Sequence, residues 1–282
     1  MNEDLIVRPA LPGDREDLAE ISRTTWEGHD YLEQVTGEWL EDSGFMVAEL
    51  EGRVIGCGKI TPFPGKVAWL EGLRVHRDFR GRGLGAVISS RILEEAMRQV
   101  ELGRFRHIEF STYINNLESR AMAEKQGFRI VEEFHVVGLE EPSPGGTVLP
   151  EVFETRLKSD DIRIYPLHAP CGWKYPRSSE SDTVEWLRRN ATFWQTPGGT
   201  RFLASRRGFE ISPLASALDD PRDFVLGAVS LAISRAMDYS EMMIHDTHRK
   251  VLEAAVEFGY EYWEEQGRAN VPVYRYFDGK SD

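Results

Sequence analysis

The spacing of apolar and polar residues predicts a mixed α/β chain. Two runs rich in β-branched residues meet at Glu51-Gly52, a pair that favours a tight hairpin turn. Between residues 85 and 100, apolar residues recur at helical spacing instead. For the first half we expect a hairpin over residues 44–60, strands at residues 5–10, 67–75, 107–112, 128–140 and 151–158, and helices at residues 14–26, 32–40, 85–100 and 119–126.

The second half of the chain repeats part of this pattern. The letters LGAV occur at residues 84–87 and again at residues 226–229, and each time we expect a helix, a short strand and a second helix to follow. Both repeats then place an aromatic residue after a glycine, at Gly127 and at Gly259. We interpret this as a degenerate internal duplication, with chance similarity between α/β units as the alternative.

Length, charge and cysteine content narrow the class of protein. A chain of 282 residues can hold two domains, and we expect them at residues 1–158 and 159–282. The formal net charge of −13 disfavours nucleic acid and anionic membranes as partners. We see no signal peptide and no apolar run that could span a bilayer. Cys57 and Cys171, one in each half, are typical of a reduced, cytoplasmic protein.

Against this acidic background, four arginines gather within nine residues, from Arg74 to Arg82. They overlap a glycine-rich stretch at the start of an expected helix. A helix N-terminus offers unpaired N–H groups and the positive end of a dipole, glycines let an anion approach the backbone, and arginines add bidentate contacts. The pattern therefore predicts a pyrophosphate cradle. Its residues are Arg80, Gly81, Arg82, Gly83, Leu84, Gly85 and Ala86.

Two other interpretations of this stretch stay open. Gly81-x-Gly83-x-x-Ala86 also fits the dinucleotide-binding fingerprint, but that fingerprint follows its strand directly and opens the fold, whereas residues 76–79 intervene here. A glycine-rich turn with solvated arginines is the second alternative. A Walker loop is excluded, because no Gly-Lys-Ser/Thr ends the stretch.

The stretch resembles a known superfamily. Arg80-x-x-Gly83-x-Gly85 is similar to the acyl-CoA pyrophosphate loop of the GNAT N-acyltransferases, and the expected strand order is similar too. The segment Asn116-x-x-Ser119-x-x-Met122-x-x-Lys125-x-Gly127-Phe128 resembles the pattern of that family's fourth helix. The resemblance covers residues 3–158. It implies a GNAT-like mixed sheet with splayed parallel strands, followed by a second, degenerate GNAT-like domain.

The resemblance also implies where acetyl-CoA binds. The family holds this co-substrate in a V-shaped gap between two parallel strands, here residues 68–75 and 108–112. Backbone groups of Leu73 and Val75 would pair with the pantetheine amides, and the Leu73 N–H would polarise the thioester carbonyl. The implied cofactor-binding residues are Leu73, Arg74 and Val75, the seven residues of the loop, and Asn116, Ser119 and Lys125.

Direct attack by an amine requires a base, because most amines are protonated at neutral pH. Glu71 precedes the loop, where many relatives carry such a carboxylate, and alternation predicts that it shares a face with Leu73 and Val75. A solvent-facing glutamate is the alternative. Relatives often place a tyrosine in the fourth helix to protonate the thiolate, but this chain has Ala123 there. Tyr113 is the candidate substitute; otherwise solvent acts, or the protein is a non-catalytic acyl-CoA sensor.

A narrower resemblance bears on the acyl acceptor. The segment EGHDYL at residues 27–32 and the segment EGLRV at residues 71–75 are similar to the histidine N-acetyltransferases. This similarity implies a small-molecule amine, for example a free amino acid such as histidine, with Trp26, Asp30 and Tyr31 lining its site. A protein or peptide substrate is the alternative. The acceptor's identity, the acyl chain length and a homodimeric state stay open.

The second half lacks the features of the cradle. In the repeat alignment Gly81 corresponds to Asp223 and Gly83 to Val225, so a carboxylate and a branched side chain replace glycines. We therefore expect a copy that cannot bind CoA and that has a structural or substrate-shaping role. His245-x-x-His248 invites a metal interpretation, but two histidines alone do not make a site, and we expect no metal.

Overall fold

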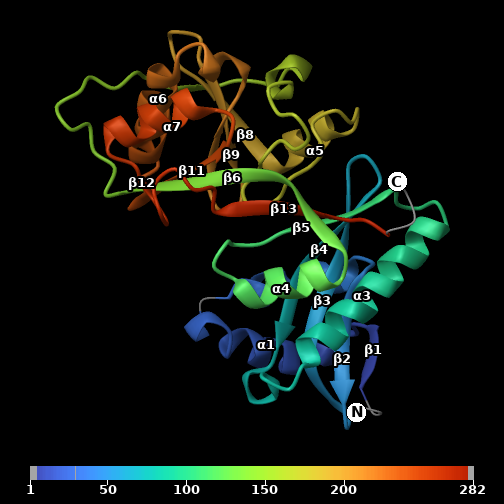
Figure 1. Cartoon of the computed structure of the whole chain (residues 1–282). Helices are drawn as coiled ribbons and strands as arrows, with labels where there is room; N and C mark the ends of the chain where they lie inside the picture. Colours follow the sequence, from blue (N-terminus) through green and yellow to red (C-terminus); the bar gives the residue numbers. More distant parts are fainter. Residues whose placement is uncertain (1–4, 29, 279–282) are drawn as a thin grey trace. The chain divides into compact units, whose positions relative to one another are not determined.

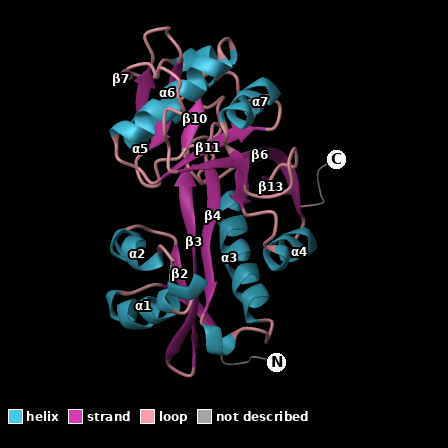
Figure 2. Ribbon diagram, turned by 90° about the vertical axis from the view of Figure 1, so that its left-hand side faces the viewer, coloured by secondary structure: helices cyan, strands magenta, loops and turns pink. Residues whose placement is uncertain are grey.

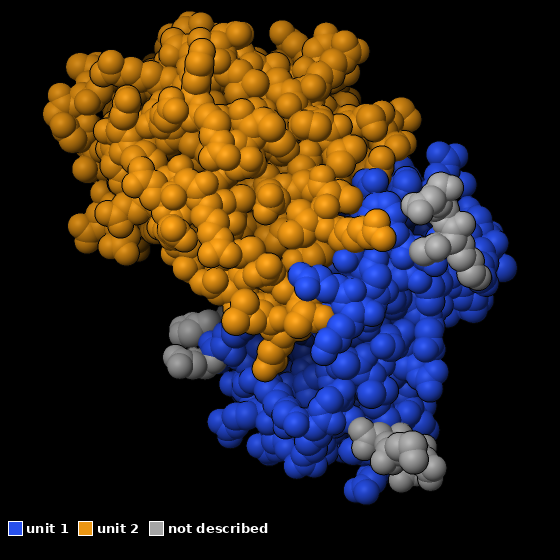
Figure 3. Space-filling view, viewed as in Figure 1, with its two compact units in different colours: residues 1–110, 122–128, 275–282 blue, residues 111–121, 129–274 orange. Residues whose placement is uncertain are grey.

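The computed structural model describes residues 5–28 and 30–278. The chain divides into two compact units, shown in different colours in Figure 3. Unit 1 contains residues 1–110, 122–128 and 275–282, and unit 2 contains residues 111–121 and 129–274. The predicted break after Lys158 differs from this division. The reason is that β6 (Phe128–Glu140) pairs through its second half, residues 134–140, with β11 (Tyr239–His245), so the strand belongs to the second unit almost from its start.

Unit 1 is a mixed sheet with helices on both faces. Its strands lie in the order β1 (Ile6–Pro9), β2 (Phe45–Leu50), β3 (Arg53–Phe63), β4 (Val67–Val75) and β5 (His107–Ser111), the last of which runs into unit 2. The first four are antiparallel, and β5 is parallel to β4. Helices α1 (Arg15–Arg23) and α2 (Leu32–Glu41) lie on one face and α3 (Leu84–Glu101) on the other, as Figure 2 shows.

The sequence explains the main features of this unit. The hairpin between β2 and β3 turns at Glu51 and Gly52, which have φ angles of 52° and 80°, as a turn with two left-handed residues requires. One apolar face of α1 buries Leu18 and Ile21 completely, and both join a core shared with α2 and β2. The returning C-terminal segment also belongs here, because the Arg275 guanidinium donates to the fully buried Glu109 of β5 at 2.6 Å.

The strands of unit 2 continue the same hydrogen-bonded sheet. Strand β11 lies between β6 and β10 (Ile211–Pro213), and the order continues through β9 (Arg201–Ser205), β8 (Ala191–Gln195) and β7 (Phe153–Glu154). The remaining elements of unit 2 are the helices α5 (Thr183–Asn190), α6 (Pro221–Ser234) and α7 (Arg249–Phe258) and the strand β12 (Glu261–Tyr262). Helix α4 (Leu117–Lys125) and strand β13 (Val271–Tyr276) each have residues in both units. Most elements carry labels in Figure 1. The strand predicted at residues 151–158 is much shorter, since only two of its residues pair with β8.

The element order confirms a degenerate second copy of the first fold. In the first half, β2, β3 and β4 are antiparallel neighbours, α3 follows, β5 returns parallel to β4, and α4 comes next. In the second half, β8, β9 and β10 are antiparallel neighbours, α6 follows, β11 returns parallel to β10, and α7 comes next. Sequence analysis missed β8, β9 and β10, because the region before α6 has no clear periodicity.

Candidate functional site

The two parallel strands of unit 1 separate after a short paired region. Register partners join Val67 to His107, Ala68 to Ile108 and Trp69 to Glu109. Beyond Trp69, β4 continues to Val75 with no β5 partner among the described residues. Backbone N–H and C=O groups on this half of β4 are therefore open to an added extended ligand. The splayed strands expected from the sequence are confirmed.

A β-bulge in β4 changes the predicted direction of Glu71. Cys57 pairs with Arg74 and Lys59 with Glu71, so β4 has one residue more than β3 between these two pairs. Gly72, with φ of 72°, supplies the left-handed residue that such a bulge favours. Paired residues share a face, so Glu71 and Arg74 lie together on the face covered by α1 and α2. The prediction that Glu71 shares a face with Leu73 and Val75 is wrong, because the extra residue reverses the alternation.

Packing on the two faces agrees with this assignment. A Cβ on Gly56, the cross-strand partner of Val75, would lie 2.7 Å from Ile88 of α3. A Cβ on Gly72 would instead lie 2.6 Å from the ring of Trp39, which belongs to α2. The bulge thus requires glycine at position 72 for two reasons, its φ angle and the ring above it.

Glu71 is half-buried and held by a neighbouring strand. The Thr61 hydroxyl of β3 donates to Glu71 Oε1 at 2.5 Å. The Glu71 carboxylate is also close enough to Tyr31 to raise the pKa of the Tyr31 hydroxyl. The pKa of Tyr31 is raised to about 12, and desolvation by burial is the main cause. The charges of Glu71 and Asp30 add to this shift, whereas the charge of Arg74 opposes it. Glu71 and Tyr31 therefore belong to one polar group on the face of α1 and α2.

The glycine-arginine loop has the geometry of an open helix start. Gly83 is the N-cap of α3, and both Gly81 and Gly83 have φ of 74°. A Cβ on either glycine would meet no atom within 4 Å, so the space beside the loop is free of protein. The first helical bond runs from Val87 N–H to the Gly83 carbonyl at 3.3 Å. The amides before Val87 therefore have no partner within the helix, as an anion site requires.

The loop arginines are exposed but tethered at one end. Arg80 donates from Nε to the Val75 carbonyl at 2.9 Å and from Nη2 to Thr25 Oγ1 at 3.0 Å. Arg82 donates to the Asp78 carbonyl at 2.9 Å. Carbonyl and hydroxyl partners leave both positive charges uncompensated. The loop thus keeps the charge that a pyrophosphate needs.

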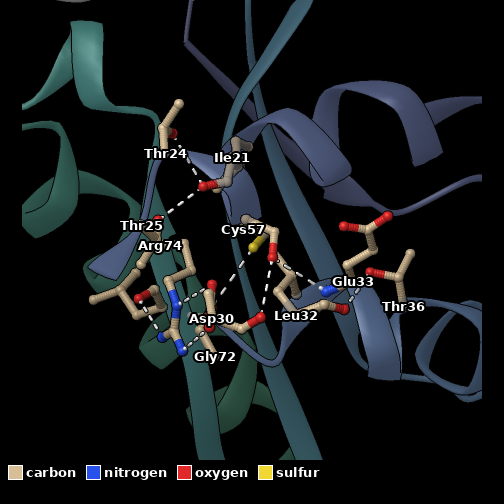
Figure 4. Close-up of polar contacts among 12 residues, drawn as sticks. Ile21, Thr24, Thr25, Asp30, Leu32, Glu33, Thr36, Cys57, Gly72 and Arg74 are labelled. Carbon is tan, nitrogen blue, oxygen red and sulfur yellow. Dashed lines mark hydrogen bonds and ion pairs between the residues drawn. The ribbon is translucent and has the colours of Figure 1, made fainter. Parts of the chain in front are cut away.

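Arg74 has a different environment, shown in Figure 4. Its guanidinium donates to both carboxylate oxygens of Asp30, at 3.0 and 2.9 Å, and the Asp30 side chain is fully buried. It also lies 4.3 Å from the ring centroid of Trp26 and 5.1 Å from that of Tyr31. Burial lowers the pKa of Arg74, but its hydrogen bonds to Asp30 outweigh this and raise the pKa overall.

This ion pair limits two of the predicted roles. Both carboxylate oxygens of Asp30 already accept hydrogen bonds from Arg74. Asp30 is therefore paired with a cation of the chain itself, whereas the sequence predicted that it would contact the substrate amine. The Arg74 side chain in turn is held on the face of α1 and α2, so its backbone is the part that an extended ligand along β4 can reach. Sequence analysis gave no signal for this pair, because its members are 44 residues apart.

The remaining predicted residues are distributed over both units. Asn116 Oδ1 accepts from the Ser119 N–H at 3.2 Å, which makes Asn116 the cap of α4. Both residues belong to unit 2, whereas the exposed Lys125 belongs to unit 1. The Tyr113 hydroxyl donates to the carboxylate of Glu264, and desolvation together with this bond raises its pKa above the ordinary value. A raised pKa makes this tyrosine a weaker acid toward a thiolate.

The helix start of the second copy is occupied by carboxylates. Asp220 Oδ1 accepts from the Asp223 N–H at 3.0 Å, and Pro221 takes the first helical position. A hollow of about 450 Å³ beside α6 is lined by Arg222 and Val225 but also by Glu140, Glu141 and Glu257. Negatively charged side chains therefore surround the start of α6, whereas the equivalent start of α3 leaves its backbone amides open.

The histidines singled out by sequence are packed, hydrogen-bonded side chains. His245 Nε2 lies 2.9 Å from Glu132 Oε1, and His168 Nδ1 lies 2.7 Å from Glu132 Oε2. His248 Nε2 contacts the Ile164 carbonyl at 3.3 Å. These bonds hold Glu132 ionised: burial raises its pKa, but the two histidines lower it to about 2. Within residues 5–28 and 30–278, no group of three acidic, histidine or cysteine side chains has the arrangement of a metal site.

Two other features of the chain are settled by the structure. Cys57 and Cys171 are free thiols, and both are buried. None of the helices in the described residues combines the length and the apolar character needed to cross a membrane.

Comparison with known proteins finds a family similarity in the first half of the chain. Residues 15–128 match the family described as the acetyltransferase (GNAT) family, a range that ends with Phe128. No curated protein matches the sequence.

Several solved structures share the fold along the whole chain. A provisionally assigned acetyltransferase from Thermoplasma acidophilum has 17% identity and a TM-score of 0.65, over 96% of this chain and 99% of its own. A second provisionally assigned acetyltransferase, from Pyrococcus horikoshii, has 20% identity and a TM-score of 0.64, over 97% of this chain and 89% of its own. A GCN5-related N-acetyltransferase from Sphaerobacter thermophilus has 13% identity and a TM-score of 0.61, over 97% and 95%. At these identities the likeness concerns the fold.

Proposed function

We propose that this chain is an acetyl-CoA-dependent N-acetyltransferase of the GNAT superfamily, which its match over residues 15–128 supports, and that it acetylates the primary amine of a small molecule by direct attack on the thioester. The observation that carries the proposal is the open start of α3 beside the unpaired half of β4. The helix start would hold the pyrophosphate of acetyl-CoA, and β4 would pair with its pantetheine arm. No covalent enzyme intermediate is needed.

The residues on β4 supply the chemistry of the transfer. Glu71 takes the proton from the attacking amine, and the amine nitrogen forms a bond to the acetyl carbon. The Leu73 N–H stabilises the oxyanion of the tetrahedral intermediate. When that intermediate collapses, the C–S bond breaks and the CoA thiolate leaves. Solvent protonates the thiolate, with Tyr113 as the alternative donor.

The bulge at Gly72 supports a particular approach of the acceptor. The bulge turns the Glu71 side chain toward the face of β4 that α1 and α2 cover, where Tyr31 also lies. The Leu73 side chain lies on the other face. The acceptor amine therefore reaches Glu71 from the side of Tyr31 and Trp26, and Tyr31 helps to orient it. A free amino acid such as histidine is one candidate acceptor; a peptide or protein amine and a non-catalytic acyl-CoA sensor are the alternatives.

Glu71→Gln tests the assignment of the base. The variant should lose about 10²- to 10⁴-fold in kcat and the acidic limb of its pH–rate profile, with acetyl-CoA affinity nearly unchanged. Glu94→Gln, at an exposed glutamate of α3 paired with Arg91, serves as the control. The assay measures CoA thiol release with a panel of amino acids, diamines, monoamines and short peptides.

The panel distinguishes the alternatives. Acetylation of peptides or intact proteins alone would replace the small-molecule proposal with the protein-modifying one. Acetyl-CoA binding without turnover of any amine would favour the sensor. An acidic limb that persists unchanged in Glu71→Gln would show that another group is the base.

A further inference from the structure

The hydrogen bond to Glu71 comes from a diagonal neighbour on β3. In the register of the two strands, Lys59 lies directly opposite Glu71, whereas Thr61 lies opposite Trp69. Diagonal neighbours in an antiparallel pair are farther apart than direct ones, but long side chains still reach across. The Thr61 hydroxyl donates to Glu71 Oε1 at 2.5 Å. The Glu71 carboxylate is therefore turned along the sheet toward Thr61, within unit 1.

Thr61 is suited to fix the direction of that carboxylate. It lies inside β3 and is only partly exposed, and its branched Cβ restricts the rotation that would swing the hydroxyl elsewhere. A hydroxyl has one proton to donate, and it carries no charge. It can therefore orient Glu71 without the charge attraction by which a cation would stabilise the carboxylate and weaken it as a base.

Two cations on the same face of the sheet are bound to other carboxylates. Lys59 Nζ donates to Asp42 Oδ2 at 3.3 Å. Arg74, which the bulge places on this face with Glu71, donates to both carboxylate oxygens of Asp30. Each cation thus has an acidic partner of its own. The hydroxyl of β3 therefore acts on a carboxylate whose charged neighbours are already paired.

The orientation of a carboxylate decides how well it takes a proton. The amine must present its N–H to a lone pair of a carboxylate oxygen within hydrogen-bond distance. Because Thr61 holds Oε1, rotation of the Glu71 carboxyl group is restricted, and the direction of its second oxygen is restricted with it. A misplacement of about 1 Å at a reacting group can cost about 100-fold in rate.

We propose that Thr61 is a positioning residue, which holds the Glu71 carboxylate in the orientation from which it takes the proton of the acceptor amine. This assignment rests on the proposed function, because Thr61 acts only through Glu71. The hydroxyl does not contact the substrate and takes no proton itself. Its contribution belongs to the proton-transfer step, so it affects kcat and leaves the binding of acetyl-CoA unchanged.

Substitutions of Thr61 separate the hydroxyl from the shape of the side chain. Thr61→Val keeps the branched shape and removes the donor, so kcat should fall by about 10- to 100-fold while acetyl-CoA affinity, measured by calorimetry, stays within about twofold. Thr61→Ser keeps the donor on a side chain that rotates more freely, and should recover most of the lost kcat. If valine prevents folding, Thr61→Ala removes the same hydroxyl with less bulk and carries the same expectation.

A threonine of unit 2 provides the matched control. Thr192 also lies within a strand, β8, is partly exposed, and donates its hydroxyl to a neighbouring strand, at the Ala204 carbonyl. Thr192→Val should therefore remove a comparable hydrogen bond from the fold without changing kcat. Equal losses of kcat in Thr61→Val and Thr192→Val would show a general effect of lost stability and would overturn the positioning role.

A double-mutant cycle adds a readout that a merely structural role would not move. In the Glu71→Gln background no carboxylate remains to be positioned, so Thr61→Val should change kcat by less than about twofold there. A 10- to 100-fold loss that persists in this background would show that Thr61 acts independently of Glu71, and the proposal would fail.

Failure of this proposal differs from failure of the proposed function. Wild-type turnover that depends on Glu71 but is unchanged in Thr61→Val would overturn the positioning role and leave the proposed function standing. Absence of turnover of every amine by the wild type, with acetyl-CoA bound, would contradict the proposed function and the positioning role together.

Discussion

At the scale of single residues, the geometry of β4 depends most on Gly72, which adds one residue to the strand at a bulge. Alternation alone therefore does not give the direction of Glu71, and an isolated glycine within a strand is the local signal of such a bulge. The hairpin at Glu51-Gly52 could be predicted, because two adjacent residues encode its left-handed backbone. The pairing of Arg74 with Asp30 has no local signal, because its members are far apart in the chain.

Replacing Gly72 tests this dependence. Gly72→Ala should destabilise the protein by about 2–3 kcal/mol, because alanine must adopt a positive φ and its methyl group would overlap the Trp39 ring. Gly52→Ala is the matched control: its φ is 80°, but a Cβ there meets nothing within 4 Å. Urea denaturation followed by circular dichroism measures both. Equal losses in the two variants would show that the ring contact contributes nothing.

The burial of His248 makes the stability of the folded protein depend on pH. Burial lowers its pKa from 6.5 to about 4, against the bond to the Ile164 carbonyl, so the folded state keeps this ring neutral. Between pH 6.5 and 4 the unfolded chain binds a proton that the folded chain does not, and stability falls as the pH drops through this range. His248→Gln should reduce the loss between pH 7.5 and 5 by about 1–2 kcal/mol. An unchanged pH dependence of the urea midpoint would contradict this role.

At the scale of elements, the start of α3 and its end provide a matched pair of glycines. Gly83 and Gly103 have φ of 74° and 72°, and a Cβ on either would meet no atom within 4 Å. Glutamate at either position therefore brings similar strain and the same charge, but only Gly83 borders the open amides. Gly83→Glu should weaken acetyl-CoA binding by at least about 100-fold, or about 2.7 kcal/mol, and Gly103→Glu should not. Calorimetry showing the same affinity for both variants would remove the pyrophosphate assignment.

Elements were easier to infer in the first half than in the second, for a physical reason. The strands and helices of unit 1 carry regular spacing and punctuating glycines, whereas β8, β9 and β10 are short, largely buried on both faces and preceded by an irregular stretch. A strand without a polar face shows no alternation. The duplication was still detectable, because α6, β11 and α7 keep the order of α3, β5 and α4 and the LGAV letters recur within both first helices.

At the scale of the whole molecule, the chain holds two copies of one topology with opposite chemistry at the equivalent helix start. The first copy offers two left-handed glycines and exposed arginines. In the second, the Asp220 side chain caps α6, Pro221 takes the first helical position and has no N–H, and three glutamates line the adjacent hollow. A capping carboxylate occupies the position that a phosphate would take, and it compensates the positive end of the helix dipole that would attract the phosphate.

The full chain should therefore bind one acetyl-CoA, not two. Isothermal titration of the wild type should give a stoichiometry of one per chain, and Gly83→Glu should leave no second, weaker site, because repulsion by Asp220 and Asp223 opposes any anion at α6. Asp220→Ser keeps a capping oxygen while removing the charge, so it should preserve folding and still not create a site, since Pro221 at the first helical position has no N–H to offer an anion. Two equivalent sites in the wild type would contradict the degenerate second copy. A second site that appears only in Asp220→Ser would show that charge alone, rather than charge together with backbone access, separates the two copies.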